Sequence, residues 1–213
     1  PVHAQKARDT LRIAVFEPIS TVDSTFEPQP QTSLFHNMVF DNLVAFDAVT
    51  RKTVPSVAQS WRQIDPTTVE FTLRQDIVFH DGQKLDADDV VYSFNFLTDP
   101  KVQFRTKEAR YGNFDSIEKI DAYTVRLKMK SPFAPLLLRL SGTMPIYPRG
   151  AHGRMTDKSA FGRSPVGSGP YQALKVGTEG IVFERNPEFR AATQGKQAGK
   201  IGRIEIVSIP DVQ

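Results

Sequence analysis

The sequence predicts a mixed α/β (α+β) protein on the strength of three patterns. Residues 69–74 and 125–130 alternate apolar and polar side chains, as half-buried strands do. Between them, residues 86–97 carry one apolar stripe at helical spacing. Turns separate these and other short strand-like segments. With 213 residues, of which 39% are hydrophobic, the chain is suited to one large domain or two small ones.

The first quarter of the chain reads as a strand, a helix and a turn. Residues 11–16 are expected to form a strand, which ends at Pro18 because proline cannot donate to a strand ladder. Thr32 and Ser33 then offer an N-cap. They precede a helix whose apolar face is carried by Leu34, Phe35, Met38 and Val39. Residues 41–47 are expected to form a turn into a new segment.

The clearest helix follows Asp86, whose side chain is expected to cap the free N–H groups of the first turn. Asp88 and Asp89 favour the positive end of the helix dipole. The apolar stripe consists of Val90, Val91, Phe94 and Leu97, and Asp99-Pro100 ends the helix. Because the three aspartates lack the spacing and the closing glutamate of a calcium loop, we expect them to cap a helix, and we expect no metal site.

The second half of the chain offers further short elements. Residues 136–140 form a short apolar segment that suits either a helix or a strand. Residues 167–171, with two glycines and a proline, predict a sharp turn with unusual backbone angles. Strands are expected at 181–184 and 204–209.

No set of residues predicts catalysis. His80, Asp81 and Gly82 are expected to form a tight turn after a strand, because adjacent strand residues point to opposite faces and make a poor relay. Ser168 lies between glycines but lacks the G-x-S-x-G frame of a nucleophile elbow. The chain has no cysteine, and its four histidines lack zinc-site spacing. We therefore expect a protein that is not an enzyme and needs no cofactor.

The charge distribution argues against nucleic acid as a partner. The formal net charge is only +3, although the pI is about 9.2. Acidic and basic residues are interspersed, and no Lys/Arg run suited to phosphates occurs. Residues 190–203 are basic and acid-free, but their glycines indicate a flexible solvated loop.

The start of the chain resembles the end of a signal peptide. Val2-x-Ala4 is a small-x-small pattern, which would make Gln5 the mature N-terminus. No apolar run is long enough to span a bilayer, and no cysteine is present to carry a lipid. We expect an exported periplasmic protein that is not lipid-anchored.

Seven segments together indicate a family. The longest is FHDGQKLDADDVVYSF at 79–94; the others, in order, are DNLVAFD (41–47), PSVAQSW (55–61), FTLR (71–74), PVGSGPY (165–171), ERNPEF (184–189) and IPD (209–211). As a set they resemble the family 5 extracellular solute-binding proteins of ABC importers, the oligopeptide, dipeptide and nickel binders. The resemblance covers about residues 11–213 and departs from the usual pattern at Ser168, where threonine is common.

The resemblance implies a periplasmic-binding-protein-like lobe within an N-terminal fragment. Residues 5–41 plus 162–213 would form a discontinuous first lobe. Residues 42–161 would form a smaller accessory domain inserted into it, and the second lobe would be absent. Such proteins close two lobes around a ligand.

The same resemblance implies that the protein would capture a peptide or peptide-like solute and deliver it to a membrane ABC permease, without catalysis and as a monomer when full length. From their placement, we expect ligand contacts in the loop after the first strand and near the end of the 136–144 segment, with one aromatic residue from the accessory domain. These candidates are Glu17, Pro18, Ile19 and Ser20; Ser141, Gly142, Thr143 and Met144; and Tyr111.

Two other functions stay open as alternatives. The same lobe would suit a ligand-sensing or interaction module without transport, in which case a DNA-binding segment should adjoin it. A hydrolase is disfavoured because no nucleophile and base pair emerges.

Overall fold

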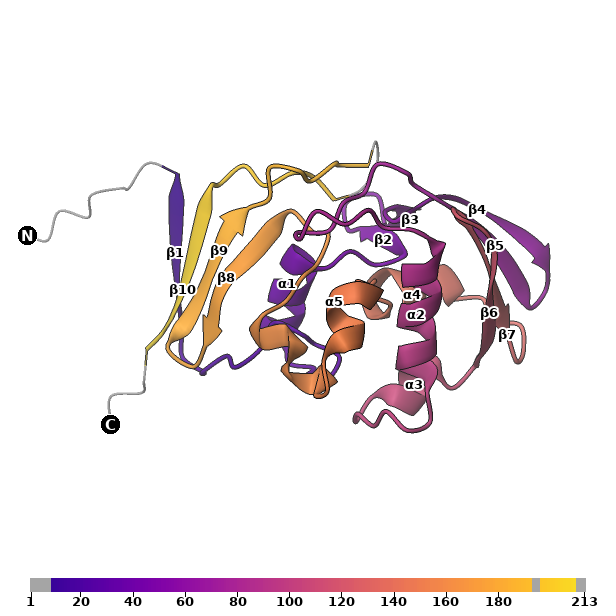
Figure 1. The fold of residues 1–213 in the computed structure, drawn as a ribbon, viewed down its shortest axis with the longest axis horizontal. Helices are drawn as coiled ribbons and strands as arrows, with labels where there is room; N and C mark the ends of the chain where they lie inside the picture. The colour runs from indigo at the N-terminus through magenta and orange to yellow at the C-terminus, as the bar shows by residue number, and fades with distance from the viewer. Residues whose placement is uncertain (1–8, 193–195, 210–213) are drawn as a thin grey trace, which may run out of the picture.

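Two four-stranded sheets lie at opposite ends of the molecule, with the helices between them (Figure 1). The computed structural model describes residues 9–192 and 196–209. The expected cleavage site at 2–5 and residues 210–211 of the IPD segment lie outside this part of the chain. Apolar side chains from both sheets and from the helices pack into one core cluster.

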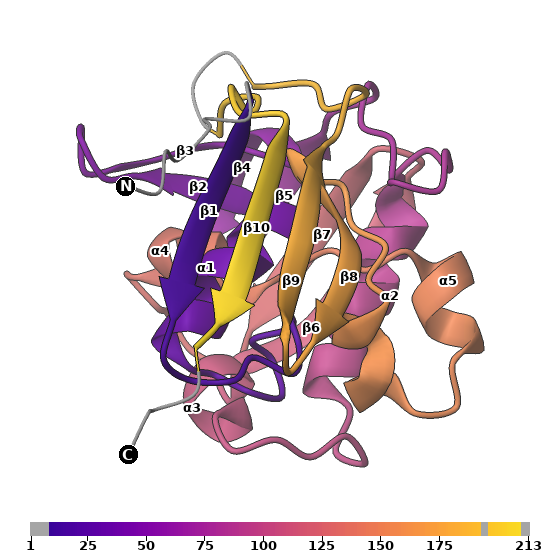
Figure 2. The ribbon, with the colours of Figure 1, turned by 90° about the vertical axis from the view of Figure 1, so that its left-hand side faces the viewer.

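The first sheet joins the two ends of the described chain. Its strand order is β1-β10-β9-β8, with β1 parallel to β10 and the other pairs antiparallel (Figure 2). The predictions at 11–16, 181–184 and 204–209 are confirmed to within a residue or so. The bounds are β1 Thr10–Val15, β8 Tyr171–Gly177, β9 Gly180–Arg185 and β10 Arg203–Ser208.

The second sheet is antiparallel, in the order β4-β5-β7-β6. The two strands predicted from alternation are its central pair. Its bounds are β4 Ala58–Asp65, β5 Thr68–Leu73, β6 Phe114–Asp121 and β7 Thr124–Met129. The first sheet therefore uses strands from residues 10–15 and 171–208, and the second uses residues 58–129. The domain boundaries, 5–41 plus 162–213 and 42–161, stay a prediction.

A two-stranded hairpin, β2 (Val44–Asp47) with β3 (Lys52–Pro55), lies between the first helix and the second sheet. The turn predicted at 41–47 is therefore wrong for residues 44–47, which form β2. Val44 pairs with Pro55 and Asp47 with Lys52, so the chain turns after Asp47 instead.

The first helix, α1 (Pro30–Val39), begins earlier than Thr32 and Ser33 predict. Gln29 occupies the N-cap position and makes no side-chain cap hydrogen bond. Pro30 fits the first turn because its fixed φ suits the helix and its missing N–H is not needed there. Thr32 is buried inside the helix, so the expected N-cap is wrong.

Helix α2 (Ala87–Thr98) confirms the predicted cap. The Asp86 carboxylate accepts a hydrogen bond from the Asp88 N–H at 2.9 Å, and the Asp89 carboxylate accepts one from the Asp86 N–H at 3.1 Å. This reciprocal arrangement is a capping box. Val90, Phe94 and Leu97 are buried, whereas Val91 lies at the edge of the stripe and is half-buried.

The remaining helices are short. The sequence predicts either a helix or a strand at residues 136–140, and the structure has a helix there. Within the described ranges, no helix has the length and apolarity needed to cross a bilayer. The bounds are α3 Lys107–Tyr111, α4 Leu136–Thr143, α5 Arg149–Arg154 and the 3₁₀ helix η1 Lys158–Arg163.

Of the sharp turn expected at 167–171, the structure shows a bend at Gly169 and Pro170, and Tyr171 already begins β8. The unusual backbone angles expected of the glycines are absent. Neither Gly167 nor Gly169 has a positive φ. A Cβ on Gly167 would instead lie 1.9 Å from the Val39 carbonyl oxygen, and one on Gly169 would lie 2.5 Å from that of Met38. The glycines are needed so that this segment can approach the end of α1.

Candidate functional site

The loop after β1 lies at the carboxyl edge of the first sheet. Val15 pairs with Ser208, and the Ile209 N–H donates to the Val15 carbonyl at 2.9 Å, so β1 and β10 end together. Ligands of open α/β sheets bind outside the carboxyl ends of parallel strands. Residues 17–20 therefore follow the carboxyl end of β1, one of the two parallel strands of this sheet.

Within this loop, the predicted residues differ in exposure. Glu17 and Pro18 are exposed and Ser20 is half-buried, whereas Ile19 is buried in the core. The Ser20 hydroxyl donates to the Glu27 carboxylate at 3.0 Å. Glu17 and Ser20 are therefore the predicted polar residues of this loop that reach solvent, and the Ser20 hydroxyl already donates to Glu27.

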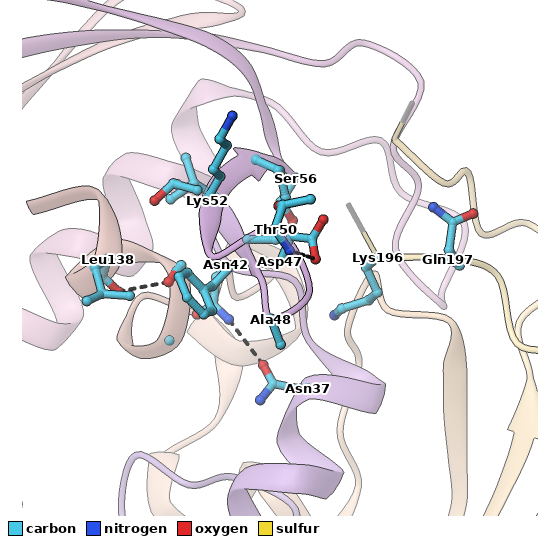
Figure 3. A pocket seen from close by; sticks show the side chains of 17 residues that line it. Asn37, Asn42, Asp47, Ala48, Thr50, Lys52, Ser56, Leu138, Lys196 and Gln197 are labelled. Carbon is cyan, nitrogen blue, oxygen red and sulfur yellow. Dashed lines mark hydrogen bonds between the residues drawn. The ribbon is translucent and has the colours of Figure 1, made fainter. Parts of the chain in front are cut away.

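A groove of about 1100 Å³ opens between the β2–β3 hairpin, α4, the end of α1 and the segment at 196–197 (Figure 3). Ser141 and Gly142, both predicted, line it from α4. Its floor and walls combine apolar and polar side chains, as small-molecule sites do. Other lining residues are Asn37, Asn42, Val44, Phe46, Val54, Leu138 and Lys196.

The last turn of α4, which lines the groove, also contacts α3. The Tyr111 hydroxyl donates to the Thr143 carbonyl, so the structure brings these two predicted residues together. Burial raises the pKa of Tyr111 above its ordinary value, which keeps the hydroxyl protonated as a donor. Met144 is fully buried and holds the turn in place through its carbonyl, which accepts from the Leu43 N–H at 3.3 Å.

Lys196 closes one side of the groove. Its ammonium pairs with Asp41 at 2.7 Å and donates to the Phe40 carbonyl at 2.8 Å. The other Asp41 oxygen accepts from the Ser168 hydroxyl at 3.0 Å. The solvated loop expected at 190–203 is wrong at Lys196, because this side chain ties the segment before β10 to the end of α1.

A buried polar network fixes the loop that leads from β1 to α1, and no sequence pattern predicted it. The Tyr147 hydroxyl donates to Asp23 at 2.9 Å, and the Thr25 N–H donates to the same carboxylate at 2.9 Å. Burial raises the pKa of Asp23 and lowers that of the nearby His36 to about 3. The Ser24 N–H donates to His36 Nδ1 at 3.3 Å, so His36 is a neutral acceptor.

The arrangement suits binding rather than bond making. His80, the one histidine beside an aspartate in sequence, has both ring nitrogens engaged by backbone groups of Gly167 and Gly169. Asp86, Asp88 and Asp89 are engaged in capping and in ion pairs with Arg149 and Lys119. The groove and the sheet edge instead offer amide, hydroxyl and carboxylate groups beside apolar surface.

Comparison with known proteins gives a consistent result. The family described as bacterial extracellular solute-binding proteins, family 5 middle, matches residues 52–213. A putative binding protein of Brucella melitensis is 30% identical over 78% of this chain and 27% of its own length. Di/tripeptide-binding protein 4 of Pseudomonas aeruginosa is 27% identical over 72% of this chain and 33% of its own.

A solved structure is similar over nearly the whole chain. NikZ from Campylobacter jejuni, in complex with Ni(L-His), superposes with a TM-score of 0.81 and 27% identity. The match covers 94% of this chain and 39% of NikZ. The chain therefore spans about a third or less of the two curated relatives and about two fifths of the solved protein, and it has the fold of one part of such proteins.

Proposed function

Because the chain belongs to the family 5 bacterial extracellular solute-binding proteins, which are not enzymes, we propose that its protein captures a peptide or peptide-like solute for an ABC importer. The solute is held between this lobe and a second one that closes over it. The closed protein then docks on the membrane permease. Export to the periplasm and a monomeric full-length protein complete the proposal.

The groove beside the last turn of α4 carries this proposal. Ser141 and Gly142 line it, and the neighbouring Thr143 contacts Tyr111. The loop at 17–20 supplies a second contact surface at the carboxyl edge of the first sheet. A peptide presents alternating N–H and C=O groups. The Ser141 hydroxyl donates to the Leu138 carbonyl but is able to accept from a peptide N–H, and Asn37, which bonds Ser33 and Asn42, keeps one N–H for a peptide C=O.

Peptides are favoured over other solutes by the chemistry of the groove. It combines amide and hydroxyl groups with apolar side chains such as Val44, Phe46 and Leu138. This mixture fits a backbone that needs hydrogen bonds and side chains that need apolar contact. A relative of this chain is named as a di/tripeptide-binding protein, which supports the same solute class.

Native mass spectrometry of the full-length protein tests the function. We expect a co-purified ligand of peptide mass. Calorimetry with alanine peptides of two to five residues should then give micromolar or tighter binding. Absence of both a peptide-mass ligand and peptide binding would contradict the function.

A matched pair of glycine variants tests the site. A Cβ on Gly142 meets nothing within 4 Å, and the same holds for Gly177 on β8. Gly142→Trp places an indole at the groove, whereas Gly177 does not line it. We expect Gly142→Trp to weaken peptide binding at least about 10-fold, the loss of roughly 1.4 kcal/mol, and Gly177→Trp to leave it unchanged. Equal binding by both variants would remove the groove from the site.

A further inference from the structure

Arg110 lies on α3, next to Tyr111 and against the loop after β1. One guanidinium nitrogen, Nη1, donates to the Ser24 carbonyl at 3.5 Å. The guanidinium also interacts with the Tyr111 hydroxyl. The residue is half-buried. Arg110 is thus a cation beside the predicted contact Tyr111 and against Ser24, in the same loop as the predicted contacts at 17–20.

Asp23, whose pKa Arg110 influences, does not use up the hydrogen-bonding capacity of the guanidinium. Arg110 acts on Asp23 at longer range and lowers the pKa that burial raises. The Asp23 carboxylate is instead bonded by the Tyr147 hydroxyl and the Thr25 N–H. Among the ion pairs of residues 9–192 and 196–209, none joins Arg110 to Asp23.

The guanidinium therefore keeps free donors. Arginine carries five N–H groups in a planar fork. Beyond the contacts with Ser24 and Tyr111, the described part of the chain gives the Arg110 side chain no further hydrogen bond. A planar fork with free donors matches a carboxylate, which accepts two parallel hydrogen bonds.

Apart from Asp23, whose carboxylate is buried and bonded by Tyr147 and Thr25, no charged neighbour in the described part of the chain neutralises Arg110. Lys107, on the same helix, turns its ammonium to the Asp99 and Val102 carbonyls. Glu108 is two residues from Arg110, a spacing at which helical side chains do not face each other. Arg105 is exposed just before α3. An anionic group of a solute is therefore attracted to Arg110 rather than repelled.

We propose that Arg110 binds a carboxylate of the solute and so selects ligands that carry one, such as the C-terminus of a peptide. This inference rests on the proposed function and deepens it. Arg110 reaches the solute from α3 while residues 17–20 and 141–143 contact its other parts. Charge-assisted hydrogen bonds of this kind change affinity by about 10–100-fold.

In the alternative, Arg110 does not contact the solute and only stabilises the fold by balancing the charge of buried Asp23. A double variant separates the two roles. If Arg110 serves only Asp23, then Asp23→Asn restores both the stability and the peptide binding that Arg110→Gln loses. If Arg110 binds the solute, the double variant recovers stability but not binding.

The experiment uses the full-length protein and alanine peptides of two to five residues, each as free acid and as C-terminal amide. Calorimetry should show free acids binding about 10–100-fold tighter than amides. Arg110→Gln should abolish this difference, Arg110→Lys should recover only part of it, and Arg154→Gln, an exposed arginine on α5, should leave it intact.

The outcomes separate this inference from the function on which it rests. Free acids and amides binding equally well would overturn the role of Arg110 and leave peptide capture standing. Recovery of free-acid binding in the Asp23→Asn, Arg110→Gln double variant would assign Arg110 to structure and overturn the inference. No binding by any of these peptides, together with no co-purified ligand of peptide mass, would overturn the proposed function and the inference with it.

Discussion

His80 and Gly167, 87 residues apart in the chain, hold each other through two reciprocal hydrogen bonds. The His80 N–H donates to the Gly167 carbonyl at 2.8 Å, and the Gly167 N–H donates to His80 Nδ1 at 3.2 Å. His80 Nε2 then donates to the Gly169 carbonyl at 3.0 Å. Burial lowers the pKa of His80, in keeping with a neutral ring that accepts at one nitrogen and donates at the other. Two of the family-like segments, at 79–94 and 165–171, thus meet at one junction.

Gly167→Ala tests how tightly this junction is packed. The new Cβ would lie 1.9 Å from the Val39 carbonyl oxygen, a backbone atom. Since backbone must shift to relieve such a contact, we expect the free energy of unfolding to fall by at least about 2 kcal/mol. Urea unfolding of the purified protein measures the loss.

Gly142→Ala is the matched control for this substitution. Its Cβ meets nothing within 4 Å, and the residue lies inside α4. Alanine is favoured over glycine in a helix, so a gain of about 0.5–1 kcal/mol is expected. If the two variants unfold at the same urea concentration, close packing does not explain Gly167.

The capping box of α2 predicts a second measurable effect. Asp86→Ala removes the acceptor of the Asp88 N–H and should cost about 1 kcal/mol of unfolding free energy. Asp86→Ser keeps a cap oxygen and should recover most of that loss. Asp88→Ala breaks mainly exposed ion pairs with Lys119 and Arg149, so it should cost less than Asp86→Ala. Equal losses for Asp86→Ser and Asp86→Ala, in thermal or urea unfolding, would argue against a capping role.

The strands that the sequence predicts in the second sheet are those buried on one face. β5 and β7 alternate buried and less buried residues, and both are central. β4 and β6 are edge strands, and beyond their first residue they are largely exposed. Without a buried face, such strands carry no period-2 apolar pattern for a sequence to show.

In the candidate site, too, some residues are predictable from local sequence patterns and others are not. Positions after a predicted strand or helix, such as Ser20 and Ser141, follow from local pattern. The pairing of Asp23 with Tyr147 joins residues 124 positions apart, and neither lies in a segment with a distinctive pattern. Arg110 is not predictable from the sequence for the same reason, because its surroundings include Ser24 and Asp23 from a distant part of the chain.

His152 predicts a loss of stability as the pH falls. The ring is fully buried, stacks on Tyr147 at 4.5 Å between centroids, and its Nδ1 bonds the Tyr92 hydroxyl at 2.6 Å. Burial lowers the pKa of His152 to about 3, whereas an unfolded chain has a value near 6.5. Below about pH 6.5 the unfolded state therefore binds a proton that the folded state does not. Stability should fall with pH toward about 3, by up to about 1.4 kcal/mol per pH unit for this one group.

The effect of His152 is separated from that of other titrating groups by comparing how the free energy of unfolding changes with pH in the wild type and in a His152 variant. Burial raises the pKa of Asp89 to about 6, so between about pH 6 and its unfolded value near 3.9 that residue favours the folded state as the pH falls. His152→Phe keeps an aromatic ring against Tyr147 but removes the titrating group, while Asp89 and His36 stay the same in both proteins. We therefore expect the variant to lose less stability than the wild type between pH 6.5 and 4, as measured by urea unfolding at each pH. If the free energy of unfolding changes with pH equally in the two proteins, His152 is protonated in the folded state without a loss of stability, which would contradict the prediction.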